Sequence, residues 1–168
     1  MSKTLVTYYS RSGNTREVAK AIYEAVEGKK ALRPINELTS GEIEGFDLVF
    51  IGFPVHAHTV PHAIHDFIKG IPEGKKIAFF STHGSLAGSR LSREALESAT
   101  VLAAKARVLG TFACRGRVSP EAMEVLQQTP EHKAWTGMAV SAQTHPDSQD
   151  LAEARNFAAW ILTLAALD

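Results

Sequence analysis

The chain has 168 residues and a mass of 18.2 kDa, a length that predicts one domain, over residues 1–168, with a core of its own. Apolar residues make up 45% and charged residues 21%, which excludes disordered and collagen-like classes. Basic and acidic side chains number 18 each, and this balance disfavours a strongly basic nucleic-acid-binding protein. The single cysteine excludes an internal disulfide, and no apolar run reaches the length of a membrane span. We therefore expect a soluble, cytoplasmic protein.

Charge is distributed unevenly along the chain. The net charge is +4 over residues 1–35, −5 over 36–74, +6 over 75–118 and −5 over 119–168. Two interpretations are open: solvated faces that alternate by chance, or a local positive field for an anionic ligand.

Short apolar runs alternate with segments of helical periodicity. The runs predict strands at residues 5–9, 31–35, 46–53, 76–81 and 108–114. The periodic segments predict helices at residues 12–26, 61–68, 90–107 and 120–128, and a last helix after residue 147. The run at 46–53 is nearly continuously apolar, which is typical of a strand buried on both faces. This alternation predicts an α/β fold in which helices cover both faces of a five-stranded parallel sheet.

Ligands of such sheets bind beyond the carboxyl ends of the strands, so the loops there carry the functional signal. The first strand is followed by Ser-Arg-Ser-Gly-Asn-Thr at residues 10–15, which contains three hydroxyls and one amide. The loop enters a helix, whose free N–H groups and dipole favour an anion. It contains no lysine, so a Walker-type nucleotide loop is excluded. The pattern predicts a phosphate held largely by uncharged donors.

This loop resembles the Thr-x-Thr-Gly-x-Thr phosphate loop of flavodoxins, with serine replacing two threonines, and the strand–helix order is similar to that family along the whole chain. The resemblance implies a flavodoxin-like three-layer sandwich with sheet order 2-1-3-4-5. It also implies noncovalently bound FMN, with the phosphate end held by Ser10, Arg11, Ser12, Gly13, Asn14 and Thr15.

The resemblance further implies that the flavin ring lies between the loops after the third and fourth strands. Flavodoxins usually place an aromatic side chain from each loop against the ring. The flat side chains here are His56 and His58 in the first loop and His83 in the second, and an imidazole can both stack and offer an N–H. We carry the ring-binding role over to Pro54, Val55, His56, Ala57, His58, Thr82, His83 and Gly84.

The sequence departs from the family in three respects. Many flavodoxins have a glycine in the first loop whose peptide flips on reduction, whereas this chain has Ala57, which resists a positive φ. The second loop lacks the usual tyrosine, and the chain is neutral where flavodoxins are strongly acidic. We expect a more open flavin face and weaker stabilisation of the one-electron-reduced flavin than in a typical flavodoxin.

The fifth predicted strand ends in Cys-Arg-Gly-Arg at residues 114–117, at the same edge of the sheet. Cys114 is either a small buried strand residue or a thiol near the flavin. Arg115 and Arg117 either lie on the solvated surface or hold an anionic substrate or partner. We include Cys114 and Arg115 among the candidate cofactor-binding residues.

Four histidines at residues 56, 58, 62 and 65 raise the question of a metal site. His58, His62 and His65 share a face if the helix begins early. No cysteine is near, and Asp66 lies elsewhere in the helical register, so we predict no metal site here.

Residues 117–147 form a long connection before the last helix and contain Trp135 and the predicted helix at 120–128. This segment is either a surface excursion that packs on the sheet edge, or a lid or partner surface near the flavin.

Two functions follow from the resemblance. The first is an electron-transfer protein that shuttles electrons between redox partners. The alternative is an FMN-dependent NAD(P)H- or quinone-type reductase that acts directly on a small substrate, which the open second loop and Ala57 favour. No Gly-x-Gly-x-x-Gly fingerprint for a nicotinamide nucleotide is present. A receiver-type signalling domain on the same fold is disfavoured, because Ser10 and Pro54 stand where acidic residues would be needed.

Overall fold

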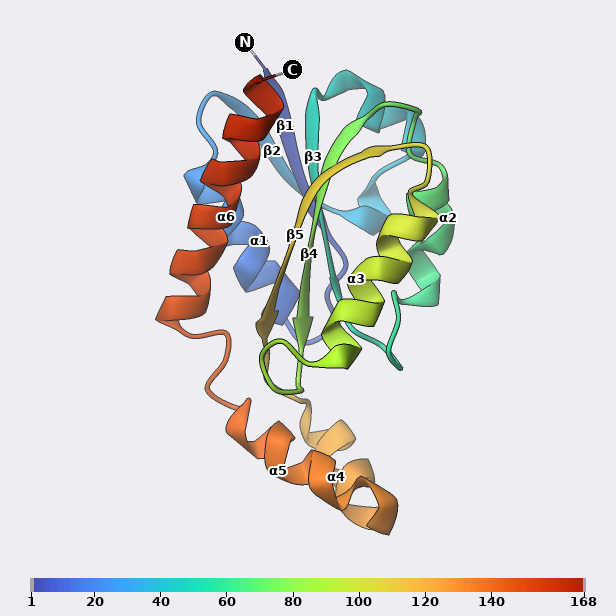
Figure 1. Cartoon of the computed structure of the whole chain (residues 1–168), viewed down its shortest axis with the longest axis vertical. Helices are drawn as coiled ribbons and strands as arrows, with labels where there is room; N and C mark the ends of the chain where they lie inside the picture. Colours follow the sequence, from blue (N-terminus) through green and yellow to red (C-terminus); the bar gives the residue numbers. More distant parts are fainter. Residues whose placement is uncertain (1, 168) are drawn as a thin grey trace.

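The computed structural model describes residues 2–167 and contains one sheet of five parallel strands (Figure 1). The strands lie in the order β2-β1-β3-β4-β5, as the resemblance implied. Their bounds are β1 (Lys3–Tyr8), β2 (Lys29–Pro34), β3 (Leu48–Pro54), β4 (Lys76–His83) and β5 (Arg107–Arg115). Every β3 residue before Pro54 is buried, which confirms that this strand is covered on both faces.

Helices cover both faces of the sheet, so the predicted three-layer sandwich is confirmed (Figure 1). On one face lie α1 (Asn14–Ala25) and α6 (Ser148–Ala166), with a buried apolar cluster beneath them. On the other lie α2 (His65–Lys69) and α3 (Arg90–Leu102), with a second cluster. Short 3-10 segments at Ile35–Glu37, Ser40–Gly45 and His62–Ile64 complete the connections on this side.

Close packing between neighbouring strands explains why residue 52, in β3, is a glycine. A Cβ on Gly52 would lie 2.1 Å from Cε2 of Phe80, on the neighbouring strand β4. The missing side chain therefore makes room for a fully buried aromatic ring.

The predicted helix boundaries needed two main corrections. The helix expected over 90–107 ends at Leu102, because residues 103–106 turn back toward the sheet and the N–H of Gly74 donates to the carbonyl of Lys105 at 2.9 Å. No glycine or proline marks this stop, so helical periodicity alone extended the helix too far. The helix expected from residue 12 begins at Asn14, after the left-handed Gly13.

The connection at 117–147 contains two helices, α4 (Pro120–Gln128) and α5 (Lys133–Ser141), of which the sequence predicted only the first. Ser119 caps α4, since its Oγ accepts the N–H of Ala122 at 3.2 Å. The two helices lie beyond the carboxyl ends of β4 and β5 (Figure 1). The segment therefore does not pack along the lateral edge of the sheet, one of the two expected arrangements, but stands over the end where a ligand would bind.

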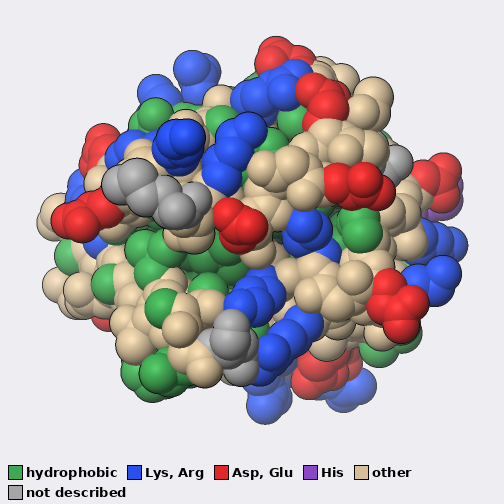
Figure 2. Space-filling model, turned by 90° about the horizontal axis from the view of Figure 1, so that it is seen from above, with side chains coloured by type: hydrophobic (Ala, Val, Ile, Leu, Met, Phe, Trp, Pro, Cys, Tyr) green, Lys and Arg blue, Asp and Glu red, His purple; other side chains and the backbone are tan. Residues whose placement is uncertain are grey.

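The opposite end of the molecule, at the amino ends of the strands, carries Lys and Arg side chains among Asp and Glu side chains (Figure 2). A depression of about 410 Å³ there is lined by charges of both signs, including Asp47, Glu73 and Lys75. Within residues 2–167, no helix has the length and apolar character needed to cross a membrane.

Candidate functional site

The loop between β1 and α1 forms a recess at the helix N-terminus. Gly13 adopts a left-handed φ of 92°, which favours glycine, and its N–H donates to Oγ of Ser10 at 3.1 Å. The first turn of α1 leaves backbone N–H groups without acceptors inside the helix. A cavity of about 380 Å³ opens beside this turn and is lined by Ser10, Arg11, Gly13 and Arg16, among others. Free N–H groups, the Ser10 hydroxyl and two arginines against one carboxylate, Glu37, make this recess suitable for a phosphate.

Two of the predicted phosphate donors have partners inside the protein. The Thr15 and Thr82 hydroxyl oxygens are 2.9 Å apart, and both residues are buried. Nδ2 of Asn14 donates to the backbone carbonyl of Arg117 at 2.8 Å, while its buried Oδ1 has no partner among the described residues. A Cβ on Gly116 would lie 2.6 Å from the same Nδ2, so Asn14 fits against the bare backbone there. In this structure Asn14 and Thr15 hold the loop in place, and Ser12 remains exposed on it.

The first predicted ring loop is a tight turn after β3. The N–H of His56 donates to the carbonyl of Thr59 at 2.9 Å, and the reverse bond measures 2.8 Å. Between them Ala57 and His58 have φ values of 43° and 69°, the signs of a type I′ turn. Ala57 resists a positive φ, as the sequence analysis stated, yet it adopts one here because the paired bonds at the turn's base hold it there. Two residues with side chains in this conformation place strain in the loop.

The second predicted ring loop follows β4 and holds a buried histidine. His83 is 7% exposed, and its Nδ1 lies 2.8 Å from Oγ of Ser85. That Oγ is also 2.6 Å from Oγ of Ser89. Burial, and then the positive charge of Arg115, lower the pKa of His83 to about 4. The imidazole is therefore neutral at pH 7 and has both a donor and an acceptor nitrogen.

The phosphate recess and the two ring loops are neighbours. The N–H of Val55 donates to the carbonyl of Thr82 at 2.9 Å, which joins the ring loops. The Thr15 and Thr82 hydroxyl oxygens, 2.9 Å apart, join the phosphate recess to the second ring loop. Burial, and then the charge of Arg11, lower the pKa of His56 in the first ring loop. Pro54 ends β3 and is half-buried. The structure thus brings the three predicted loops together at one end of the sheet.

The end of β5 connects the second ring loop to α5 through Arg115. Its Nε donates to the carbonyl of Ser85 at 2.8 Å, and its Nη2 donates to the carbonyl of Met138 at 2.9 Å and to Oγ of Ser141 at 2.7 Å. Arg117 instead pairs with Glu17 on α1, at 2.9 Å between Nη2 and Oε2. Both guanidinium groups hold segments of the protein together in this structure.

Cys114 is a core residue of β5. It is 5% exposed and lies in the apolar cluster beneath α1 and α6. Burial, together with the negative charge of Asp150, raises the pKa of its thiol well above the usual range. Of the two interpretations of Cys114, the structure matches the small buried strand residue.

A larger cavity of about 790 Å³, here called the end cavity, separates the ring loops from α4 and α5. The ring loops supply Val55, Ala57, His58, His83, Gly84 and Ser85 to its wall, and Leu91 of α3 adds to that side. The other side comes from Val118, Ala122, Val125, Leu126, His132, Trp135 and Ala139. A Cβ on Gly84 would lie 2.4 Å from Cγ2 of Val118, so the two sides meet closely at this glycine.

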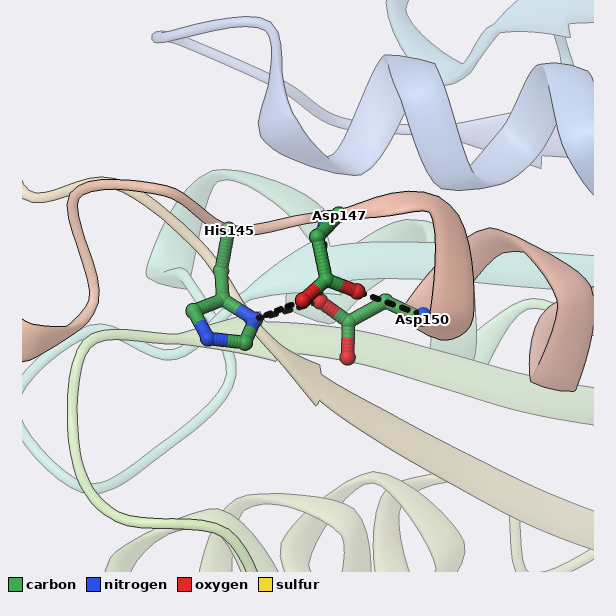
Figure 3. Close-up of side chains that lie close together, drawn as sticks. All are labelled: His145, Asp147 and Asp150. Atoms are coloured by element: carbon green, nitrogen blue, oxygen red, sulfur yellow. Dashed lines mark hydrogen bonds and ion pairs between the residues drawn. The ribbon is translucent and has the colours of Figure 1, made fainter.

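His145, Asp147 and Asp150 form the one group with metal-ligand spacing found among residues 2–167 (Figure 3). Nδ1 of His145 is 2.6 Å from Oδ2 of Asp150 and 3.7 Å from Oδ2 of Asp147. The carboxylates also accept backbone N–H groups: Asp147 from Gln149 and Asp150, and Asp150 from Asp147. This is a capping box at the start of α6, with His145 attached to it, and we assign no metal to it.

The histidines considered for a metal lie in two separate arrangements. The His62 and His65 rings are 5.0 Å apart between centroids, and Nε2 of His65 lies 3.1 Å from the carbonyl of Val60. His58 instead lies edge-on to Trp135, with 6.3 Å between centroids.

Sequence reasoning missed two parts of the site. Arg16 lines the phosphate recess, and its place one residue after the loop, in the first turn of the helix, was a signal that could have found it. Trp135 of α5 and His132, just before it, line the end cavity only because this segment lies over the end of the sheet. No local sequence pattern predicted that position.

Comparison with known proteins agrees with this geometry. Residues 5–159 match the flavodoxin domain family. The chain is 28% identical to the flavodoxin-like domain-containing protein BilS of Clostridioides difficile, over 98% of this chain and 99% of that protein. Similar structures include oxidised flavodoxin 2 from Bacillus cereus, with a TM-score of 0.65, 20% identity and coverage of 96% and 98% of the two chains. A flavoprotein from Lactobacillus acidophilus in complex with FMN has a TM-score of 0.52, 22% identity and coverage of 67% and 93%. Since the match spans nearly the whole chain and the sheet has the corresponding order, this protein belongs to the flavodoxin domain family.

Proposed function

We propose that the protein binds one FMN and passes electrons between redox partners. The observation that carries this proposal is the recess at the N-terminus of α1, where Gly13 turns the chain and Ser10, Arg11 and Arg16 line a cavity of about 380 Å³. The FMN complex of the related Lactobacillus flavoprotein supports the choice of ligand.

In this proposal the phosphate is held by the loop at residues 10–13, by the first N–H groups of α1 and by the two arginines. The ring lies between residues 54–58 and 82–84. When bound, FMN supplies the ability to accept and release electrons, and the protein orients it and controls the access of water. The neutral imidazole of His83 can offer or accept a hydrogen bond at the ring edge, and His56 and His58 provide flat faces.

A cytoplasmic location is part of the proposal. It rests on the lone, buried Cys114, since a fold stabilised without disulfides suits a reducing compartment.

The test is a titration of the ligand-free protein with FMN and with riboflavin, followed by flavin fluorescence. Ser12→Ala removes one donor to the phosphate, and a hydrogen bond to a charged group contributes about 1.5–3 kcal/mol. We expect at least a roughly ten-fold rise in the FMN dissociation constant, with little change for riboflavin. Ser148→Ala, which removes an exposed hydroxyl at the start of α6, is the matched control. Equal losses for both flavins, or no FMN binding by the unaltered protein, would reject the proposal.

Direct reduction of a small substrate is the second candidate, and the end cavity is the observation that favours it. Steady-state oxidation of NAD(P)H by a quinone, with no partner protein present, would support this activity. Reduction only in the presence of a partner protein would favour electron transfer.

A further inference from the structure

Three polar side chains form a continuous hydrogen-bonded chain in the connection between β4 and α3. Nδ1 of His83 lies 2.8 Å from Oγ of Ser85, and that oxygen lies 2.6 Å from Oγ of Ser89. His83 and Ser85 are buried, whereas Ser89 is only half-buried, at the start of α3. The chain therefore leads from a buried imidazole toward the protein surface.

Helix capping does not explain the hydroxyl of Ser89. This residue occupies the N-cap position of α3, but its side chain accepts no N–H group of that helix. Ser119 and Asp147, at the same position of α4 and α6, do accept N–H groups of their helices. The Ser89 hydroxyl instead bonds to Ser85, which leaves the usual role of an N-cap serine unfilled.

The inner end of the chain opens into the end cavity. Because Nδ1 of His83 is engaged with Ser85, the other ring nitrogen, Nε2, is the one left for a ligand. Among the described residues Nε2 has no hydrogen-bond partner, and it is not one of the fully enclosed polar atoms that lack one. It is therefore open to the cavity that His83 lines, beside the place proposed for the flavin ring.

The imidazole of His83 does not store a proton at neutral pH. Burial, and then the positive charge of Arg115 on β5, lower the pKa of His83 to about 4. Asp150 on α6 acts on it more weakly in the opposite direction, and both charged groups are hydrogen-bonded elsewhere. A neutral imidazole gives up the proton on Nε2 easily only when Nδ1 receives another one. Ser85 is placed to supply that proton.

We propose that His83, Ser85 and Ser89 form a relay that delivers a proton from water to the flavin ring when the ring takes up electrons. The acceptor in this relay rests on the proposed function. The Nε2–H bond of His83 breaks as an N–H bond forms on the ring, while Ser85 passes its hydroxyl proton to Nδ1. Ser89 then passes its proton to Ser85 and regains one from water.

The relay itself is left neutral by these transfers. The ring gains two electrons from the redox partner and one proton from water, and His83 ends with its proton on Nδ1. When the ring loses its electrons, the proton returns to water by the same steps in reverse. The starting tautomer of His83 is thereby restored, so a protein that passes electrons on can use the relay repeatedly.

The first measurement needs no flavin. NMR of the imidazole nitrogens in the ligand-free protein distinguishes the two tautomers, and we expect His83 to carry its proton on Nε2. Ser85→Ala should mix the tautomers, because Nδ1 then loses its donor. Ser98→Ala, which removes another α3 hydroxyl with a bond to Thr59 at 3.2 Å, is the matched control and should leave the tautomer unchanged. A proton on Nδ1 in the unaltered protein would point the chain the wrong way and overturn the relay.

The second measurement separates electron uptake from proton uptake in the protein loaded with FMN. Reduced methyl viologen supplies electrons without protons. Stopped-flow absorption then follows the flavin, and a pH-indicator dye in weak buffer follows the proton. We expect proton uptake to be at least roughly ten-fold slower in Ser85→Ala and in Ser89→Ala. Ser89→Thr, which keeps the hydroxyl, should retain most of the rate, and Ser98→Ala should change it less than two-fold.

The outcomes separate the relay from the proposed function. Equal proton-uptake rates in all these variants would show that water in the end cavity protonates the ring directly, which overturns the relay and leaves the proposed function standing. A rate in Ser89→Thr as low as in Ser89→Ala would assign the effect to the shape of the loop, and would also overturn it. Failure of the unaltered protein to bind FMN would reject the proposed function and the relay together. If Ser85→Ala does not fold, Ser89→Ala, at a half-buried position without a capping bond, carries the comparison.

Discussion

The hydroxyl oxygens of Thr15 and Thr82 lie 2.9 Å apart and join the first turn of α1 to the end of β4. Both residues are almost fully buried, at 1% and 2% exposure. The bond therefore connects the phosphate recess to the second ring loop through the interior of the protein. It fixes the relative position of the two loops before any ligand binds, which lowers the cost of ordering them on binding.

Replacing either threonine with valine should destabilise the fold. Thr15→Val leaves the Thr82 hydroxyl buried without a partner, and Thr82→Val does the reverse, at about 1–3 kcal/mol each. The double variant should cost clearly less than the sum of the two, which a double-mutant cycle by urea unfolding measures. Thr7→Val is the matched control, because the buried Thr7 hydroxyl has no partner among the described residues and its loss should not destabilise. Additive costs in the cycle would contradict the pairing.

Glycine in the first ring loop should stabilise the protein. At Ala57, with a φ of 43°, the left-handed conformation costs a residue with a Cβ about 1–2 kcal/mol, which glycine avoids. The greater freedom of glycine in the unfolded chain opposes this by about 0.5–1 kcal/mol. We expect Ala57→Gly to gain several tenths to 1 kcal/mol in urea unfolding. Ala87→Gly, at an exposed position whose own φ is not positive, is the control and should lose stability. If Ala57→Gly lowered the free energy of unfolding as much as Ala87→Gly does, the turn at residue 57 would not be strained.

The same loop bears on the redox properties expected from the sequence. In an anaerobic redox titration, we expect the unaltered protein to accumulate little one-electron-reduced flavin, and Ala57→Gly to accumulate more. The physical reason is that a peptide next to glycine changes conformation more easily. A large, stable one-electron-reduced species in the unaltered protein would contradict this expectation.

Protonation of His83 should weaken the fold in mild acid. Burial, then Arg115, lower its pKa from 6.5 to about 4, so the folded protein keeps the ring neutral while the unfolded chain takes up a proton. The neutral, buried His83 ring therefore adds to the free energy of unfolding in full above pH 6.5, and this stabilisation is lost as the pH falls toward 4. At about 1.4 kcal/mol per pKa unit, the loss is on the order of 3 kcal/mol. His83→Gln should therefore flatten the fall in unfolding free energy between pH 6.5 and 4, and His62→Gln, at an exposed position, is the control. An NMR titration that finds the His83 pKa near 6.5 would reject this.

Arg115 should control the mobility of the segment at 118–146. Its donors reach Ser85, Met138 and Ser141, so Arg115→Met frees α5 from the second ring loop. Two or more lost hydrogen bonds, at about 0.5–1.5 kcal/mol each, predict roughly ten-fold faster amide exchange in α5 by mass spectrometry. The strands β1 and β3 should exchange as before, and Arg93→Met, at an exposed position on α3, should change neither. Uniform acceleration across the sheet would indicate general destabilisation instead.

The sequence by itself predicted the five strands, the helices that cover the sheet and the end of the sheet where the candidate site lies. Apolar runs and helical periodicity are local patterns that predict strands and helices. Gly13 and the hydroxyls beside it predict a helix N-terminus that favours an anion. The rule that ligands lie beyond the carboxyl ends of parallel strands then placed the loops at 54–58 and 82–84 beside it.

Only the tertiary structure decided what each side chain does there. Asn14 and Thr15 point to partners about 100 and 67 positions away in the chain, Arg117 and Thr82, and a pattern within six residues carries no such information. The hydrogen bond from Arg115 to Met138 of α5 likewise joins distant segments, so no local pattern could predict it. Helical periodicity did not predict α5 itself. Local sequence fixes backbone conformation through sterics and turn chemistry, whereas the partner of a buried polar group depends on which distant segments the whole fold brings within 3 Å of it.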